Sequence, residues 1–432
     1  MKKITLIATC AFGLEAIVKR EIIKLGFDDI KVSDGKVEFL ADVNDIAKVN
    51  LWLRCAERIL LKMDEFKVLS FEDLYQGIKK IKWEELISVN DKFPVNANSV
   101  KSKLFSLSDI QKITKRSIVD RLKNVYGVEW FDETSDALYY IEVSILKDIA
   151  TVTVDTSGEA LHKRGYRKRA GDAPLKETLA SAMISLSFWD PSRVFYDPFC
   201  GSGTLCIEAY MIGRNIAPGI MRNFAFENWN LLDKDALKNE KNRARALIDY
   251  DRELKILGSD IDRRSILRAR DNADILGVED EISFFIKDMR DVDLYNEYGV
   301  VVTNPPYGER MGDIEEVERL YRDFGKKFKE LDTWSVYLIT SMENFERLYG
   351  RKADRKRKLF NGRIKVDFYG KNHISKKRKR RKASDTRRYC NRYGAALFVR
   401  RTVQLMWVMD GKFKKNQQLH KNRVFCYFIG DI

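Results

Sequence analysis

VFYDPFCGSGT, residues 194–204, is the segment that says most about the architecture of this 432-residue chain. It opens with a short apolar run that ends at Asp197, as expected for a buried strand. Gly201 and Gly203 then remove side chains where the loop must turn toward a helix and let a ligand approach the backbone. The free N–H groups at the start of that helix point toward the same place. The segment therefore predicts a ligand site between a strand and a helix.

The sequence of this loop favours a ligand with an amino-acid moiety over a nucleotide. A dinucleotide site requires a third glycine, where this chain has Cys206, and an acidic residue about 20 positions further on, which is missing. No phosphate-binding G-x-x-x-x-G-K-[ST] loop occurs in the sequence. Asp197 at the strand end suits a cationic amino group, so we expect a zwitterionic ligand.

The residues after 193 alternate between strand and helix patterns, which is typical of a parallel doubly wound sheet. Strands are expected at residues 194–197, 255–259, 282–286, 300–303 and 335–339. Helices are expected at residues 174–189, 204–212, 263–276, 314–329 and 344–349. A hairpin at 356–369, with Asn361-Gly362 as its turn, would complete the sheet. A seven-stranded α/β sheet with a reversed terminal hairpin is the usual Rossmann-like architecture of S-adenosylmethionine (AdoMet)-dependent methyltransferases.

Acidic residues follow the next two strands and extend the predicted cofactor site. Asp260 follows the second strand, where a ribose diol would lie, and Ile261 is placed to cover an adenine face. Asp262 is expected to cap the next helix. Asp288, after the third strand, is placed to accept from an adenine amino group. The expected cofactor contacts are Asp197, Phe199, Gly201, Gly203, Asp260, Ile261 and Asp288.

A rim stiffened by proline follows the fourth strand at Asn304-Pro305-Pro306-Tyr307. Because the prolines cannot extend a sheet, the Asn304 amide oxygen and the Pro305 carbonyl remain as acceptors at the strand end. Two acceptors that hold both hydrogens of an exocyclic base amine would aim its lone pair at an activated methyl group. Tyr307 offers a ring on which the base stacks, worth about 1–3 kcal/mol. These four residues are the expected catalytic residues.

The composition excludes several other chemistries. Six cysteines without a C-x-x-C pair, together with three histidines, give no zinc-ligand spacing, and no metal is expected. His162 is the only histidine before residue 370, which leaves almost nothing for a histidine-dependent hydrolase. No run approaches the ~18 apolar residues of a membrane span, and the polar N-terminus does not resemble a signal peptide. We therefore expect a cytoplasmic protein that does not enter membranes.

Two smaller α/β units precede this sheet in the N-terminal part of the chain. The first shows the order β-α-β-β-α-β of a ferredoxin-like unit, with a hairpin turn at Asp34-Gly35. The expected segments are a ferredoxin-like unit at 1–65, a second α/β unit at 66–155, a basic linker at 156–173, a catalytic domain at 174–369 and a basic tail at 370–432.

The net charge of +15 lies entirely in the tail. Lys and Arg outnumber Asp and Glu by 18 to 3 within residues 370–432. The overall charge is therefore weak evidence about what the rest of the chain binds. A basic run such as KKRKRRK at 376–382 is either a nucleic-acid arm or an extension without a catalytic role, including a non-native reading frame. We favour the extension, because the catalytic sheet is complete before it.

Several motifs together resemble one family, the THUMP-domain RNA guanine-N2 methyltransferases, and especially the bacterial 23S rRNA (guanine-N2) methyltransferase L group. The motifs are LRCAER at 53–58, HKRGYR at 162–167, APLKETL at 173–179, DPFCGSGT at 197–204, DID at 260–262 and NPPYGER at 304–310. The resemblance covers residues 1 to about 369 and is specific in combination. Relatives of this group usually end soon after the final hairpin, so the tail is the departure from the pattern.

The resemblance implies a ferredoxin-like unit and a THUMP domain that dock structured RNA, followed by a domain that binds AdoMet. Pro174 and Glu177 would border the cofactor pocket. Lys101, Lys103 and Lys112, around the start of a helix, would meet RNA phosphates.

The sequence thus predicts methyl transfer from AdoMet to the N2 amine of a guanosine, with 23S rRNA as the expected substrate. Three alternatives remain open: a tRNA guanine-N2 methyltransferase, a DNA adenine-N6 methyltransferase, and an RNA-binding protein without activity. The oligomeric state and the modified nucleotide are not predicted.

Overall fold

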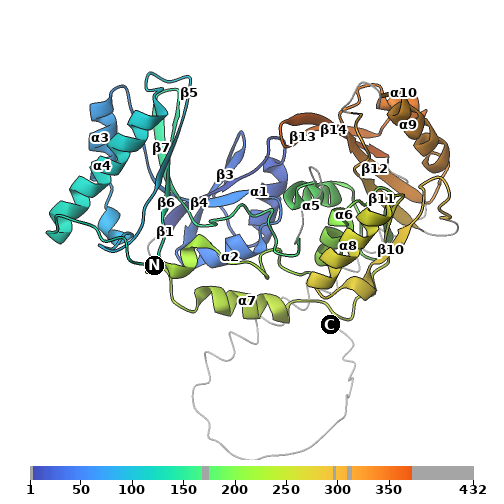
Figure 1. Cartoon of the computed structure of the whole chain (residues 1–432), viewed down its shortest axis with the longest axis horizontal. Coiled ribbons are helices and arrows are strands. Elements are labelled where there is room, and N and C mark those ends of the chain that lie inside the picture. The colour runs from blue at the N-terminus through green and yellow to red at the C-terminus, as the bar shows by residue number, and fades with distance from the viewer. Residues whose placement is uncertain (1–2, 168–174, 295–297, 309–313, 372–432) are drawn as a thin grey trace, which may run out of the picture. The chain divides into compact units, whose positions relative to one another are not determined.

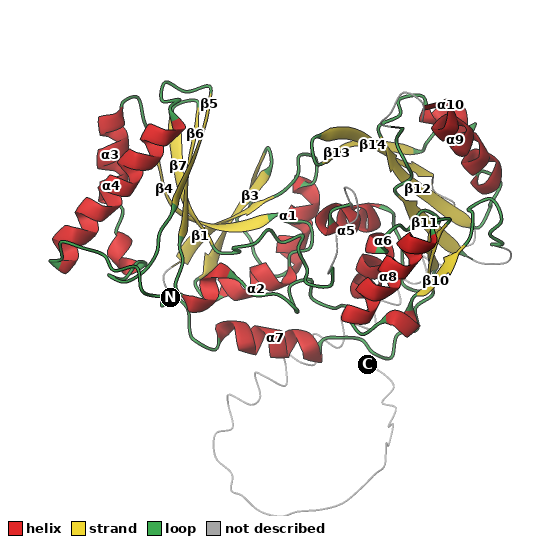
Figure 2. Cartoon of the chain, in the orientation of Figure 1, coloured by secondary structure: helices red, strands yellow, loops and turns green. Residues whose placement is uncertain are grey.

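The computed structural model describes residues 3–167, 175–294, 298–308 and 314–371. In these residues the strands form two seven-stranded sheets, one from the front half of the chain and one from the back half. Figures 1 and 2 show the helices that accompany both sheets. Pro174 and the tail from residue 372 onward lie outside the described residues.

The front sheet has the strand order β2-β3-β1-β4-β7-β6-β5. Its strands are β1 (Lys3–Thr9), β2 (Lys31–Ser33), β3 (Lys36–Asp42), β4 (Arg58–Lys67), β5 (Val95–Val100), β6 (Tyr140–Leu146) and β7 (Ile149–Asp155). Its helices are α1 (Glu15–Lys24), α2 (Asp45–Trp52), α3 (Phe71–Lys80) and α4 (Leu107–Tyr126), with a 3-10 turn at Trp83–Glu85. The predicted β-α-β-β-α-β order at the front is confirmed, and Ser33 pairs with Lys36 around the predicted Asp34-Gly35 turn.

Strand β4 belongs to both front units. It pairs antiparallel with β1 on one side and with β7 on the other. The two units that the sequence presents in succession therefore share one hydrogen-bonded sheet. The sequence pattern did not predict this continuity, because strand periodicity carries no information about which strand lies next to which.

The back sheet has the strand order β10-β9-β8-β11-β12-β14-β13. Its strands are β8 (Val194–Asp197), β9 (Ile256–Asp260), β10 (Ser283–Ile286), β11 (Gly299–Thr303), β12 (Trp334–Thr340), β13 (Arg355–Asn361) and β14 (Ile364–Lys371). Its helices are α5 (Glu177–Leu186), α6 (Thr204–Gly213), α7 (Ala236–Ala246), α8 (Arg263–Ile275), α9 (Ile314–Phe328) and α10 (Phe345–Tyr349), with 3-10 turns at Ala225–Asn228 and Glu279–Glu281. Strands β8 to β12 are parallel and β14 is antiparallel, which confirms the predicted methyltransferase-type sheet.

Two local predictions were wrong. Helix α5 spans Glu177–Leu186 rather than 174–189, and Phe188 just beyond it has a φ of +55°, a left-handed conformation that ends the helix. The turn of the last hairpin is Gly362-Arg363 rather than Asn361-Gly362, because Asn361 still pairs with Ile364. Glycine at the first turn position, here with a φ of +63°, fits a type II′ turn.

A segment between α6 and β9 joins the back half to the front half, and the sequence gave no expectation for it. The Trp229 ring stacks on Tyr139 with centroids 4.7 Å apart, and its Nε1 donates to the Leu138 carbonyl at 3.1 Å. Trp52 of α2 donates from Nε1 to Glu240 of α7 at 2.8 Å. The segment therefore fixes the catalytic sheet to the front sheet by both stacking and hydrogen bonds.

The core of the back half is built around its central parallel strands. Every residue of β11 and of β12 is buried, as expected for strands covered on both faces by helices. The carboxyl end of β11, at Thr303, leads directly into the predicted rim at Asn304–Tyr307. Among the described residues, no helix combines the length and the apolar character that a bilayer crossing requires.

Candidate functional site

The glycine loop between β8 and α6 is shaped for close approach of a ligand. The Cys200 N–H donates to the Ser259 carbonyl of β9 at 2.9 Å, which anchors the loop over the sheet. Gly203 has a φ of +81°, and a Cβ there would lie 2.9 Å from the Phe284 ring. Gly201 has a φ of +51°, and a Cβ there would meet open space. Glycine at 203 is therefore demanded by packing, whereas Gly201 leaves room above the loop.

Asp197 connects this loop to the neighbouring strand. Its side chain is buried, and its Oδ1 accepts from the Thr303 hydroxyl at 2.6 Å and from the Phe199 N–H at 3.1 Å. Its Oδ2 has no hydrogen-bond partner among the described residues. Burial raises the pKa of the Asp197 carboxyl to about 7, opposed by these two hydrogen bonds and reinforced by the charge of Asp260. A buried, half-partnered carboxylate is suited to a cationic ligand group.

Asp260 supports the loop from the end of β9. One of its oxygens accepts from the Gly201 N–H at 3.0 Å and the other from the Asp262 N–H at 2.9 Å. Asp262 caps α8 by accepting from two backbone N–H groups, which confirms the predicted cap. Ile261 is 69% exposed, so its side chain is available to a ligand above the sheet. A ribose diol at Asp260 would use the remaining lone pairs of a carboxylate already held in place.

Both carboxylate oxygens of Asp288 already accept hydrogen bonds in the structure. Arg290 donates to both of its oxygens, from Nε at 2.9 Å and from Nη2 at 2.6 Å. These hydrogen bonds lower the pKa of the Asp288 carboxyl against the opposing effect of partial burial. An adenine amine at Asp288 would therefore have to share the carboxylate with Arg290.

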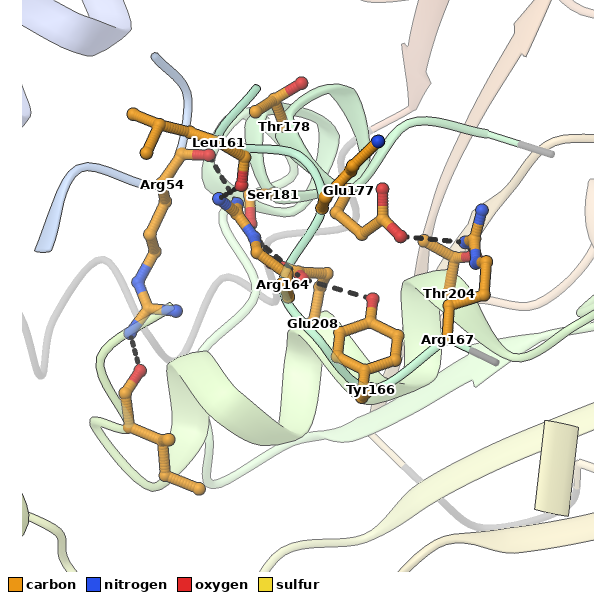
Figure 3. Close-up of polar contacts among 12 residues, drawn as sticks. Arg54, Leu161, Arg164, Tyr166, Arg167, Glu177, Thr178, Ser181, Thr204 and Glu208 are labelled. Atoms are coloured by element: carbon orange, nitrogen blue, oxygen red, sulfur yellow. Dashed lines mark hydrogen bonds and ion pairs between the residues drawn. The ribbon is translucent and has the colours of Figure 1, made fainter. Parts of the chain in front are cut away.

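Glu177 lies where three segments meet (Figure 3). It opens α5, and its Oε1 lies 3.2 Å from Nη2 of Arg167 in the linker. The same Nη2 donates to the hydroxyl of Thr204, the first residue of α6, at 2.5 Å. Oε2 of Glu177 and Nε of Arg167 are buried without a partner among the described residues. Burial raises the pKa of the Glu177 carboxyl although Arg167 lies beside it.

A second buried ion pair lies beside the first (Figure 3). Arg164 of the linker and Glu208 of α6 are almost completely inaccessible, with Nε and Oε1 3.4 Å apart. Arg164 also donates to the carbonyl of Arg54 in the front unit, while Tyr166 and Ser181 donate to Glu208. The sequence analysis identified HKRGYR only as a family motif and did not predict this ion pair. The pattern that could have predicted it is Glu208, a charged residue at an apolar position of a helix, because a buried charge requires a buried partner.

The Asn-Pro-Pro-Tyr rim follows β11 directly. The Tyr307 hydroxyl donates to Oδ1 of Asn304, and Asn361 of the β13–β14 hairpin donates from Nδ2 to that hydroxyl at 3.5 Å. Tyr321 of α9 donates to the Pro306 carbonyl at 2.8 Å, which fixes the proline turn. Asn304 and Tyr307 are both partly exposed. The predicted catalytic residues thus form one hydrogen-bonded rim with an acceptor that keeps a second lone pair.

Other predicted residues lie elsewhere. Lys101, Lys103 and Lys112 are exposed in the β5–α4 loop and the first turns of α4.

The described residues hold no cluster of His, Cys, Asp and Glu that would bind a metal. A cavity of about 430 Å³ opens at the start of the strands, lined by Lys255, Glu281 and neighbouring residues, and shares no residue with the loop or the rim.

Comparison with protein families assigns three segments of the chain. Residues 164–369 match an RMKL-like methyltransferase domain, residues 5–60 an RlmL ferredoxin-like domain, and residues 69–155 a THUMP domain.

Comparison with individual proteins points the same way. The chain is 48% identical over 387 residues to "Putative RNA methyltransferase YpsC" of Bacillus subtilis (strain 168), covering 89% of this chain and 100% of that protein. It is 36% identical over 364 residues to "Ribosomal RNA large subunit methyltransferase K/L" of Psychromonas ingrahamii, covering 82% of this chain. The chain spans about half the length of that K/L protein, 48%.

Solved structures give close matches over both sheets. "SMU.472, a putative methyltransferase complexed with SAH" is 44% identical with a TM-score of 0.83, covering 87% of this chain and 99% of that chain. "A predicted N6-adenine-specific DNA methylase" from Listeria monocytogenes is 47% identical with a TM-score of 0.83, covering 87% of this chain and 97% of that chain.

Proposed function

The chain belongs to the family of RMKL-like methyltransferases with RlmL ferredoxin-like and THUMP domains, and from this premise we propose that it methylates the N2 amine of a guanosine in 23S rRNA. It is an AdoMet-dependent RNA methyltransferase of the RlmK/L type. The substrate base, the amine and the RNA are the proposed part.

The proposal rests on one observation, the hydrogen bond between Thr303 and Asp197. It joins the ends of β11 and β8, which are adjacent parallel strands. The glycine loop follows one strand and the Asn-Pro-Pro-Tyr rim follows the other, so a methyl donor on the loop and an amine on the rim would meet at neighbouring strand ends. Alignment of donor and acceptor is the main requirement of this reaction.

The residues of the loop fit AdoMet. Within the described chain, Oδ2 of Asp197 and Oε2 of Glu177 have no hydrogen-bond partner and suit its ammonium group, and Arg167 suits its carboxylate. Asp260 would hold the ribose and Ile261 would cover the adenine. When bound, AdoMet supplies a methyl group on a sulfonium that is already an activated leaving group.

The rim would orient the amine. The second lone pair of Asn304 Oδ1 and the Pro305 carbonyl would accept the two N2 hydrogens, and Tyr307 would stack on the base while its hydroxyl stays on Asn304. The nitrogen that gains the methyl group would release its surplus proton to water. No tuned acid or base is needed, because the leaving sulfide is neutral.

The same rim would also grip the N6 amine of adenine, and the name of the Listeria relative points to that substrate. The front units favour RNA, since the chain carries a THUMP domain.

The test incubates the full chain and labelled AdoMet with unmodified 23S rRNA, unmodified tRNA and duplex DNA in separate reactions, followed by nucleoside mass spectrometry. We expect N2-methylguanosine from 23S rRNA alone. Label in tRNA guanosine would move the substrate to tRNA, and N6-methyladenine from DNA would overturn the proposal. The Asn304→Ala variant is the control for methyltransferases that contaminate the preparation.

A further inference from the structure

The β13–β14 hairpin carries a concentration of positive charge beside the predicted catalytic rim. Six of residues 355–365 are Lys or Arg and none is acidic. Lys356 is paired with Asp367 at 3.0 Å, and the Arg355 guanidinium lies 4.8 Å from the centroid of the Phe188 ring. Among the described residues, the ion-pair and ring contacts of this hairpin leave Lys358, Arg363 and Lys365 without such a partner.

Three exposed cations surround the hairpin tip: Lys358, Arg363 and Lys365. Within the described part of the chain, no acidic side chain forms an ion pair with any of them. Lys358 and Lys365 share one face of the hairpin with Phe360, because Phe360 pairs directly with Lys365 and side chains alternate along each strand. Arg363 lies in the turn itself.

An aromatic pair completes this surface. Phe12, in the loop after β1, is 54% exposed and meets Phe360 edge to face with ring centroids 6.0 Å apart. Its loop is held rigidly, because the Glu15 carboxylate accepts from the N–H groups of Gly13 and Gly35, each at 3.0 Å. Phe12 is therefore presented at a fixed position although it costs free energy to expose an aromatic ring to water.

The hairpin is pinned on both sides. A Cβ on Gly13 would lie 2.9 Å from the Lys358 carbonyl, so the front loop abuts β13 backbone to backbone, at the end of the sheet seen in Figure 1. At the tip, Asn361 donates to the Tyr307 hydroxyl at 3.5 Å. The hairpin thus connects the front unit to the rim that is proposed to hold the target base.

We propose that the hairpin tip, with Lys358, Arg363 and Lys365 on phosphates and the Phe12–Phe360 pair against a base, binds the unpaired RNA strand that flanks the methylated nucleotide. This inference rests on the proposed function for the location of the target base. Cations without protein partners match a phosphate backbone. The exposed Phe12 ring beside the half-buried Phe360 matches unstacked bases, which RNA offers in loops and duplex DNA does not.

The first experiment measures binding of the full chain to unmodified 23S rRNA over a series of salt concentrations. The variant carries Lys358→Gln, Arg363→Gln and Lys365→Gln, which remove the charges and keep polar side chains. The control carries Lys234→Gln, Lys238→Gln and Arg245→Gln, which remove the same charges from exposed positions at and before α7. We expect the hairpin variant to lose about 2 from the slope of log affinity against log salt, since each phosphate contact contributes about 0.7–0.9, and the control to keep the slope.

The second experiment measures steady-state methylation by Phe12→Leu, which keeps apolar volume but not the ring. We expect the KM for RNA to rise at least about fivefold, with the KM for AdoMet unchanged. An unchanged salt slope together with an unchanged KM, or no RNA binding by the wild-type chain, overturns the inference. Duplex DNA is titrated in parallel, and a slope change with DNA but none with 23S rRNA also overturns the inference. RNA binding is measured separately from methyl transfer, so the two proposals can fail independently. If the salt slope changes as expected but the methylated base is not N2-methylguanosine, the proposed function is wrong and the inference about RNA binding stands.

Discussion

Thr303 donates a 2.6 Å hydrogen bond to Oδ1 of Asp197 and leaves Oδ2 of the same carboxylate without a partner in the described chain. The bond orients a buried carboxylate whose second oxygen is free for a ligand. It also joins the end of β11 to the end of β8, where the glycine loop begins.

Removing this hydrogen bond is expected to weaken AdoMet binding. Thr303→Val keeps the shape of the side chain but deletes the donor, and a hydrogen bond to a charged group is worth about 1.5–3 kcal/mol. We expect the Kd for AdoMet, measured by calorimetry, to rise about tenfold or more. Thr303→Ser, which retains the hydroxyl, is the matched control and should stay near wild type. Equal affinities for Val and Ser would show that the bond does not orient Asp197.

Asn304→Ala is expected to abolish methyl transfer and to leave AdoMet affinity within a few-fold of wild type. The change removes an acceptor that acts on the amine and not on the donor, and loss of one such group typically costs about 10²–10³ in kcat. Single-turnover methylation and AdoMet calorimetry on one preparation separate the two effects. A comparable loss of both would contradict the role assigned to Asn304.

The stabilisation of the chain by AdoMet is expected to grow between about pH 6 and pH 7.5. Burial holds the pKa of Asp197 at about 7 in the folded chain, above its ordinary 3.8. Between about pH 3.8 and pH 7 the folded chain therefore holds a proton that the unfolded chain has released. The contribution of Asp197 to stability falls over that range and levels off above about pH 7, where the folded carboxyl is charged. The ligand ammonium, charged below about pH 7.7, would offset the charged carboxylate that appears there.

The measurement is the AdoMet-induced shift in Tm across this pH range. Asp197→Asn should flatten the dependence, because the amide does not titrate. Glu177→Gln is the companion variant, since burial also raises the pKa of Glu177. A shift in Tm that is independent of pH in the wild-type chain would show that the ammonium lies elsewhere.

Arg164→Met is expected to destabilise the chain by about 3–5 kcal/mol, because it leaves the buried Glu208 carboxylate without its cation. The double variant Arg164→Met with Glu208→Leu removes both charges and should recover much of this loss. Urea unfolding of the three proteins gives the comparison. A double variant as unstable as the single one would mean that hydrogen bonds from Arg164 to backbone carbonyls, rather than the ion pair, carry the effect.

The sequence predicted the parts of the site that are local. The strand–glycine–helix segment, the cap at Asp262 and the proline rim each depend on neighbours within a few residues, and the structure has each element there. The roles assigned to the site residues remain predictions. The error at the hairpin turn was one residue, yet it moved Asn361 from the turn into the strand, where it reaches Tyr307.

The parts that the sequence did not predict are long-range. Arg164 and Glu208 are 44 residues apart, and Asp197 and Thr303 are 106 apart. No periodicity records such a partnership, because each side chain satisfies its own local pattern. The segment around Trp229 was missed for the same reason, since its aromatic partner Tyr139 lies directly before β6 of the other sheet.

Strand β4 also determines where this chain can be divided. Its edges are both occupied, one by β1 and the other by β7. A fragment ending after β4 would expose the unpaired backbone N–H and C=O groups of that strand to solvent. Such an open edge can pair with strands of other chains and cause aggregation. The junction between the first two family segments is thus continuous in hydrogen bonding, and the front sheet cannot be divided there without exposing a strand edge.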